Sequence, residues 1–112
     1  MIARIWQAKT RPGLGEAYQS YLEKTGLKDY RATPGLKQLL VLRRELGDQT
    51  EYLLITIWED LEAIKRFAGP TPELAVYYPD DDEFLAPGEL RPEVVHFNLV
   101  SNEDYSLPAK LA

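Results

Sequence analysis

The sequence predicts one α+β domain in which four strands and two principal helices follow one another in the order βαββαβ. Three observations lead to this expectation: four segments are rich in β-forming residues, two carry apolar residues at helical spacing, and turns containing Pro or Gly separate them. Because each helical crossover takes the same hand, we expect a four-stranded antiparallel sheet with the helices on one face.

The first strand and the first helix occupy the first third of the chain. Residues 2–8 are rich in β-formers and end before a polar stretch and the turn at Pro12. From Leu14 onward, apolar residues recur at the spacing of an amphipathic helix. This helix should weaken around Gly26 and end at residues 33–35, where the sequence is Thr-Pro-Gly.

The middle of the chain predicts a β-hairpin and the second helix. Residues 36–46 and 51–58 are apolar and rich in β-formers, and the connector between them has hairpin length. Asp60 is a favourable N-cap for a helix that should end at Gly69.

The last third predicts further helical pieces and the fourth strand. With Thr71 as cap and Pro72 as first helical residue, we expect a helical segment that reaches Tyr78. The acidic run at 80–83 fits the first turn of a short helix, with its carboxylates in solvent rather than on a metal ion. Residues 93–100 alternate in polarity and predict the fourth strand.

Composition and charge argue against several classes of partner. The 112 residues fit one domain, which we expect at residues 1–100, followed by a polar tail at 101–112. A net charge of −5 with scattered basic residues argues against binding of nucleic acid. The chain has no cysteine for a disulfide, a thiol nucleophile or a Cys-ligated zinc. No apolar run resembles a membrane span or a signal peptide, so we expect a cytoplasmic protein without membrane contact.

Both faces of the predicted sheet are apolar. In the strand at residues 51–58, one parity holds Leu53, Ile55 and Ile57 and the other holds Tyr52, Leu54 and Trp58. Helices should cover one face only, and the apolar area left on the other exceeds what monomers usually expose. We therefore expect a homodimer formed through the sheet face. The alternative is that the C-terminal tail folds over this face.

Three segments carry a family resemblance. They are Ile2-Ala3-Arg4-Ile5-Trp6 running into Lys9-Thr10-Arg11-Pro12-Gly13, Leu54-Ile55-Thr56-Ile57-Trp58-Glu59 leading into Leu61-Glu62-Ala63-Ile64 and Phe67, and Tyr77-Tyr78-Pro79-Asp80. In this order they resemble the antibiotic biosynthesis monooxygenase family, which has a ferredoxin-like fold and forms a dimeric α/β barrel. The resemblance implies a pocket in each subunit between sheet and helices. Some members oxidise polycyclic phenols with O2 and no cofactor, and others bind and degrade heme.

The heme-degrading branch of this family relies on an Asn on the first strand, a Trp late on the second helix and a His further on. By spacing, those places hold Trp6, Phe67 and Tyr77 here, and none matches. The only histidine, His96, lies on a different element, so the sequence offers no obvious iron ligand. We expect no cofactor and no bound metal.

The residues expected to build the pocket are mostly aromatic. A cofactor-free oxygenase needs a pocket that orients a phenol, a group that takes its proton and a donor that stabilises the developing oxyanion. The candidate substrate-binding residues are Arg4, Trp6, Tyr18, Tyr21, Phe67, Tyr78 and Asn98, and the candidate catalytic residues are Trp58, Tyr77 and His96.

Each candidate has a structural alternative. His96 shares a strand parity with Asn98 and could shuttle a proton near neutral pH, or it could be a satisfied or edge histidine. Arg4 shares parity with Trp6 and could pair with a substrate anion, or it could be half of a structural ion pair. Any single aromatic residue is also explained by core packing.

The leading hypothesis is a cofactor-independent monooxygenase that oxidises a small aromatic, phenolic or quinone-forming compound with O2. The alternative is a non-catalytic dimer that binds or senses a small aromatic ligand, which a pocket without any titratable group besides tyrosine would favour. Heme binding or degradation ranks third.

Overall fold

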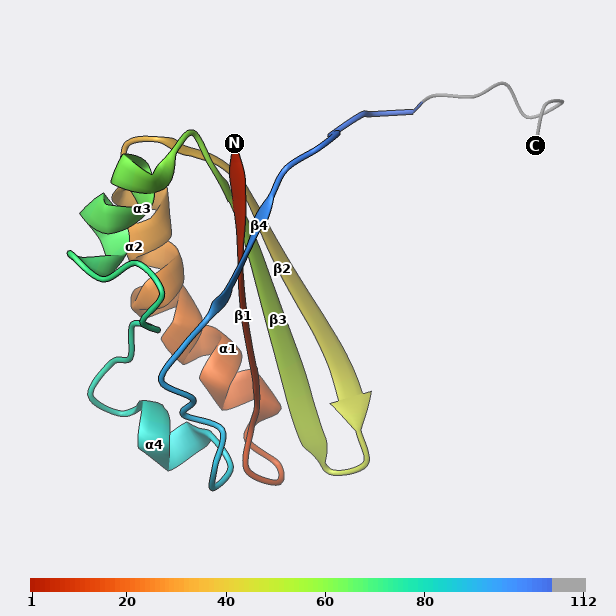
Figure 1. Cartoon of the computed structure of the whole chain (residues 1–112). Helices are drawn as coiled ribbons and strands as arrows, with labels where there is room; N and C mark the ends of the chain where they lie inside the picture. The colour runs from red at the N-terminus through yellow and green to blue at the C-terminus, as the bar shows by residue number, and fades with distance from the viewer. Residues whose placement is uncertain (106–112) are drawn as a thin grey trace, which may run out of the picture.

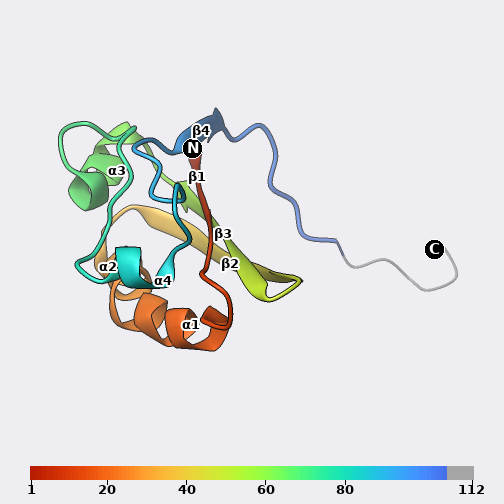
Figure 2. The same ribbon diagram turned by 90° about the horizontal axis from the view of Figure 1, so that it is seen from below.

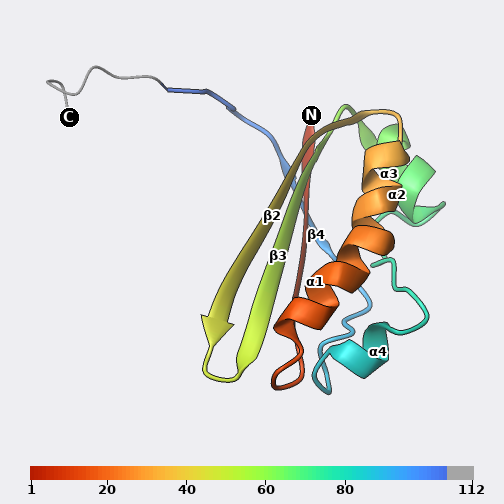
Figure 3. The same cartoon turned by 180° about the vertical axis from the view of Figure 1, so that it is seen from behind.

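The computed structural model describes residues 1–105 and confirms the predicted α+β fold. Within that range the strands are β1 (Ile2–Lys9), β2 (Leu36–Leu46), β3 (Gln49–Trp58) and β4 (Val95–Asn98), and the helices are α1 (Gly15–Lys24), α2 (Gly26–Ala32), α3 (Leu61–Ala68) and α4 (Asp81–Phe84). The strands form one antiparallel sheet in the order β2-β3-β1-β4 (Figure 1). The described helices all lie on the same side of this sheet, which is clearest from below (Figure 2) and from behind (Figure 3).

The two-residue period of the central strands separates the two faces of the sheet. Antiparallel register places Trp6 of β1 opposite Leu54 of β3, and both are buried toward the helices. The helices contribute the other half of this core, with Tyr18, Leu22, Leu27, Tyr30 and Ile64 each less than 5% exposed. Burial of one such side chain stabilises the fold by roughly 1.5–3 kcal/mol, so this layer is the main source of stability.

The helix boundaries follow the local sequence signals. The first helical region breaks at Thr25, next to Gly26, and continues as α2, as the sequence predicted. Asp60 caps α3 by accepting a hydrogen bond from the backbone N–H of Ala63 at 2.9 Å, and Gly69 ends the helix with φ 90°. Both expectations for α3 are confirmed.

The predicted helix at residues 71–78 is wrong, because this segment pairs with the chain just before β4. The backbone N–H of Ala75 donates to the carbonyl of Pro92, and that of Val94 donates to the carbonyl of Glu73, both at 2.9 Å. This pairing with a distant segment overrides the local helix-start signal at Thr71. It also takes Glu93 and Val94 out of the fourth strand, which was predicted at residues 93–100 and extends over Val95–Asn98.

The face of the sheet opposite the helices is apolar and uncovered by any helix of residues 1–105. Its side chains include Ala3, Ile5, Leu40, Leu42, Leu53, Ile55, Ile57, Val95 and Phe97. Leu42, Val95 and Phe97 are 44%, 52% and 57% exposed. Beyond β4 the chain crosses toward the start of β2, where the Asn102 amide donates to Gln38 at 3.1 Å. The rest of the predicted tail, residues 106–112, lies outside the described range.

None of the helices in the described part of the chain has the length and apolar character needed to cross a membrane.

Candidate functional site

A cavity lies between the sheet and the helices. Its wall consists of Arg4, Trp6 and Leu54 from the sheet, Tyr18, Leu22, Gly26, Tyr30 and Phe67 from the helices, and Val76, Tyr78 and Asp81 from the segment after α3. The space among these side chains is about 340 Å³ with its opening to solvent included, but only about 20 Å³ of this can hold the centre of a water molecule. A volume of this size accommodates one or two waters, so an aromatic ligand fits only if part of the wall moves.

Arg4 is the cationic group of the cavity wall and is 1% exposed. Its Nη2 donates to the carbonyl of Leu74 at 2.9 Å, and its Nη1 donates to the Tyr30 hydroxyl at 3.4 Å. The guanidinium carbon lies 5.4 Å from the centre of the Phe67 ring, within the range of a cation–π interaction. Burial lowers the pKa of Arg4, and Tyr30 raises it. The side chain keeps its charge at neutral pH, because an arginine pKa starts far above that range.

Asp81 is the acidic group of the wall, and its burial corrects the expectation that the whole acidic run at 80–83 lies in solvent. The side chain is 3% exposed, whereas its neighbours Asp80 and Asp82 are exposed. Its Oδ1 accepts a hydrogen bond from the Tyr18 hydroxyl at 3.0 Å, and its Oδ2 accepts one from the backbone N–H of Tyr78 at 2.6 Å. Burial raises the pKa of Asp81, while the two hydrogen bonds lower it.

One local sequence signal for Asp81 was available. Its own backbone N–H donates to the carbonyl of Tyr78 at 3.0 Å, and its carboxylate accepts from the backbone N–H of Tyr78, so the two residues close a turn from both ends. An acidic residue three positions after Tyr78 is placed to make this bond. The same pair points the Asp81 carboxylate inward, where Tyr18 meets it. Burial, and then Asp81, raise the pKa of Tyr18 and keep its hydroxyl protonated as the donor.

Two of the predicted aromatic residues pack behind the cavity wall. Trp58 is fully buried, its indole Nε1 donates to the Thr56 hydroxyl at 2.8 Å, and its ring lies 6.0 Å from that of Phe67. Tyr21 stacks on Phe84 with ring centres 5.0 Å apart. These two residues support the wall rather than line the cavity.

The other predicted residues lie apart from the cavity. The Tyr77 hydroxyl donates to the carbonyl of Arg91 at 2.6 Å, and its ring meets the outer edge of Trp6. His96 lies opposite Arg4 in the β1–β4 register, and its Nε2 is buried without a hydrogen-bond partner. Burial and then Arg4 lower the pKa of His96. Asn98 is exposed on the edge strand.

The structure therefore gathers half of the predicted site residues around one cavity. Those that line it are Arg4, Trp6, Tyr18, Phe67 and Tyr78. Asp81 and Tyr30 complete it without having been among the predicted site residues. Among residues 1–105 no cluster of His, Cys, Asp and Glu side chains could hold a metal ion.

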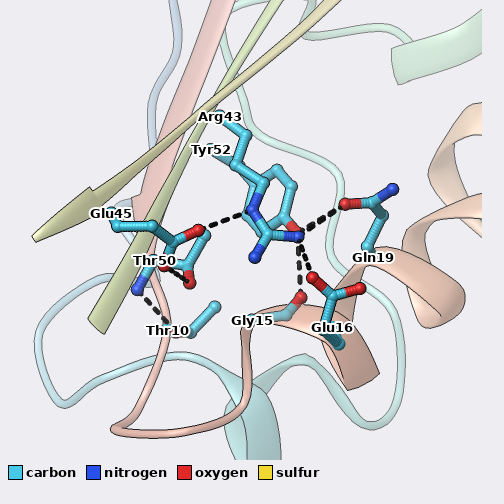
Figure 4. A network of polar contacts seen from close by, with 8 residues as sticks. All are labelled: Thr10, Gly15, Glu16, Gln19, Arg43, Glu45, Thr50 and Tyr52. Atoms are coloured by element: carbon cyan, nitrogen blue, oxygen red, sulfur yellow. Dashed lines mark hydrogen bonds and ion pairs between the residues drawn. The ribbon is translucent and has the colours of Figure 1, made fainter. Parts of the chain in front are cut away.

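A polar network fixes the first turn of α1 against the β2–β3 hairpin, as Figure 4 shows. Arg43 forms ion pairs with Glu16 and Glu45, each at 2.7 Å. The Tyr52 hydroxyl donates to the carbonyl of Gly15 at 2.8 Å. Since Tyr18 lies one helical turn after Gly15, this network sets the position of the Tyr18 hydroxyl that reaches Asp81.

The fold and the cavity define a class: a ferredoxin-like domain with a cavity between the sheet and the helices. Residues 1–71 match the model of the antibiotic biosynthesis monooxygenase family, and the chain belongs to this family.

Two solved structures share the fold. One is a protein from Bacillus cereus assigned to the antibiotic biosynthesis monooxygenases, with a TM-score of 0.57 and 13% identity over 96% of this chain and 98% of that one. The other is a mutant of MhuD with two manganese protoporphyrin IX molecules bound per active site, with a TM-score of 0.60 and 20% identity over 94% of this chain and 100% of that one. No curated protein sequence matches the chain.

Proposed function

We propose that the protein is a cofactor-independent monooxygenase that oxidises a small aromatic, phenolic or quinone-forming compound with O2 in the helix-side cavity. The observation that carries this proposal is the buried carboxyl group of Asp81 in a wall that, apart from Arg4, consists of aromatic and apolar residues. A pocket for simple binding of an aromatic compound needs no titratable group besides tyrosine. A carboxyl group whose pKa is raised by burial is suited to accept a proton from a weakly acidic substrate.

In the proposed reaction Asp81 acts as the general base. The substrate O–H or C–H bond breaks, its proton moves to a carboxylate oxygen of Asp81, and the resulting anion supplies electrons to O2. One oxygen atom enters the product as a carbonyl and the other leaves as water, so a CH2 group and O2 give C=O and H2O. Tyr18 holds the carboxylate in place through its 3.0 Å hydrogen bond. The predicted catalytic roles of Trp58, Tyr77 and His96 stay predictions, and none of these three residues lines the cavity.

We also propose that the protein is a homodimer formed through the open face of the sheet. Support comes from the exposed apolar side chains of that face, which include Leu42, Val95 and Phe97. Sedimentation equilibrium at micromolar concentration tests this proposal. A mass near that of one 12.8 kDa chain would contradict it.

Oxygen uptake tests the enzymatic proposal. Hydroquinones, anthrones and flavonoid-like phenols are offered one by one to the wild type, Asp81→Asn, Asp82→Asn and His96→Ala. Asp82 is the matched control, because its carboxylate is the exposed neighbour of Asp81. We expect Asp81→Asn to lower the rate by about 10²–10⁴-fold, the usual contribution of a general base, and Asp82→Asn to leave it unchanged. Equal rates for wild type and Asp81→Asn would refute the assignment of the base.

The alternative functions predict different results in the same set of measurements. If compounds bind but none consumes oxygen, the protein is a binding or sensing dimer instead. Heme binding, the third candidate, predicts a Soret shift on titration with heme. We rank it last because no imidazole lines the cavity in the part of the chain that the structure describes.

A further inference from the structure

Arg4 is a buried cation with unused hydrogen-bonding capacity. A guanidinium group carries five N–H donors, and the protein groups that accept from Arg4 are the Leu74 carbonyl and the Tyr30 hydroxyl. Its Nε is buried without any partner. No carboxylate of residues 1–105 forms an ion pair with it, so the structural ion pair considered from the sequence is not found there.

An unpaired buried charge is unusual enough to require a counterpart. Removing a guanidinium group from water is costly unless an opposite charge or a full set of acceptors replaces the water. The Phe67 ring, 5.4 Å from the guanidinium carbon, offsets only part of this cost. The donors that remain need acceptors, of which an anionic oxygen binds a guanidinium most strongly, and the space beside Arg4 that could hold one is the cavity that it lines.

We propose that Arg4 is the oxyanion anchor of the cavity and that the substrates are aromatic compounds with an acidic hydroxyl, bound as their phenolate or enolate anions. This inference rests on the proposed function, because it concerns the same cavity. It assigns Arg4 and Asp81 complementary tasks: Asp81 accepts the proton of the substrate, and Arg4 holds the oxygen that becomes negative. An interaction between a guanidinium fork and an anionic oxygen is stronger than one between neutral groups, so binding selects for the anion.

A pair of probes that differ only in charge tests the proposal. Lawsone is a hydroxynaphthoquinone that is anionic at neutral pH, and its O-methyl ether is neutral and of nearly the same shape. We expect wild-type protein to bind lawsone at least about tenfold more tightly than the ether at neutral pH, the effect of one charge-assisted hydrogen bond. Arg4→Met should reduce this ratio to about one. Arg31→Met removes an exposed arginine outside the cavity and should preserve the ratio.

A second measurement needs no variant and covers the case in which Arg4→Met does not fold. Lawsone changes colour when it ionises, so the pKa of its hydroxyl can be read in the bound state by visible titration. Binding beside Arg4 should lower this pKa relative to free lawsone. An unchanged or raised pKa, equal affinity for the two compounds, or no binding of either at millimolar concentration would each overturn the proposal.

The two proposals fail in distinguishable ways. If lawsone is preferred and its pKa falls, but no phenol consumes oxygen, the oxyanion anchor stands and the monooxygenase reading fails. If oxygen is consumed but the charge preference is absent from wild type, the monooxygenase reading stands and Arg4 is not the anchor.

Discussion

Replacing Gly15 by alanine tests how closely α1 must approach the sheet. A Cβ at this position would lie 2.1 Å from the Oγ1 of Thr50 and 2.9 Å from its Cβ, well inside van der Waals contact. The backbone of Gly15 does not have a positive φ, so the cost of the substitution is steric and not conformational. Thr50 is 3% exposed and cannot move aside into solvent.

The expected loss of folding free energy can be worked out from the groups that must move, which are the Thr50 side chain and α1. Rotating Thr50 breaks the hydrogen bond from its hydroxyl to the Glu45 carboxylate, which is 2.7 Å long, and a bond to a charged group is worth about 1.5–3 kcal/mol. Rotation leaves the Cβ of Thr50 2.9 Å away, so the helix must also shift, which strains a well-packed core at about 1–3 kcal/mol. Alanine offsets about 1 kcal/mol of this cost, because its helix propensity is higher than that of glycine. The free energy of unfolding should therefore fall by about 1.5–5 kcal/mol.

Urea unfolding at one fixed protein concentration measures this change. Gly26→Ala is the matched control, since its Cβ would lie 3.7 Å from the Tyr78 ring, an ordinary contact, and should change stability by less than about 1 kcal/mol. In a Thr50→Ala background, Gly15→Ala should lower the free energy of unfolding by at least about 1 kcal/mol less than in wild type, because the hydroxyl that makes the closest clash is absent. A Gly15→Ala variant within about 0.5 kcal/mol of wild type would refute the close approach of helix and sheet.

Three further predictions concern the cavity and the open face. Trp58→Phe removes the N–H that bonds to Thr56 in a fully buried site, so urea unfolding should show a loss of about 1–3 kcal/mol, and no loss would contradict the packing role. Tyr18→Phe removes a hydrogen bond that lowers the pKa of Asp81. That pKa then rises further, and because the base must be ionised, the acid limb of the pH–rate profile for oxygen uptake should move to higher pH. If the acid limb of the profile stays at the same pH, ionisation of Asp81 does not control the rate of oxygen uptake. Ile55→Asp places a charge in the centre of the open face, so sedimentation should show a monomer, and an intact dimer would locate the interface elsewhere.

The sheet side of the cavity could be predicted from the sequence because strands have a strict two-residue period. Antiparallel pairing keeps Arg4 opposite Thr56 and Trp6 opposite Leu54, and paired residues point to the same face of the sheet. A face assigned to one strand from its hydrophobic pattern therefore also holds for its neighbour. The same period placed His96 on the parity of Asn98, and the register brings His96 opposite Arg4. Parity alone does not tell how far a side chain reaches, however, and His96 does not line the cavity.

The wall contributed by the segment after α3 could not be predicted in the same way. This segment has no period, and its course is set by bonds to distant residues, such as that between the Tyr77 hydroxyl and the Arg91 carbonyl. The local helix-start signal at Thr71 therefore predicted a helix that does not form. The burial of Asp81 depends on the position of Tyr18, which is distant in the sequence. Side chains placed by irregular backbone need the tertiary structure before their roles can be assigned.

Two parts of the chain build the cavity wall, and only one of them lies within the region that matches the family. The family match ends at residue 71, whereas Val76, Tyr78 and Asp81 close the cavity from beyond that point. The matched part supplies Arg4 and the aromatic side chains Trp6, Tyr18, Tyr30 and Phe67 of the wall. The unmatched part supplies the proposed base and the final shape of the cavity. A variant of this chain altered only between residues 72 and 94 would therefore keep Arg4 and its aromatic neighbours but lose the proposed base and one side of the cavity.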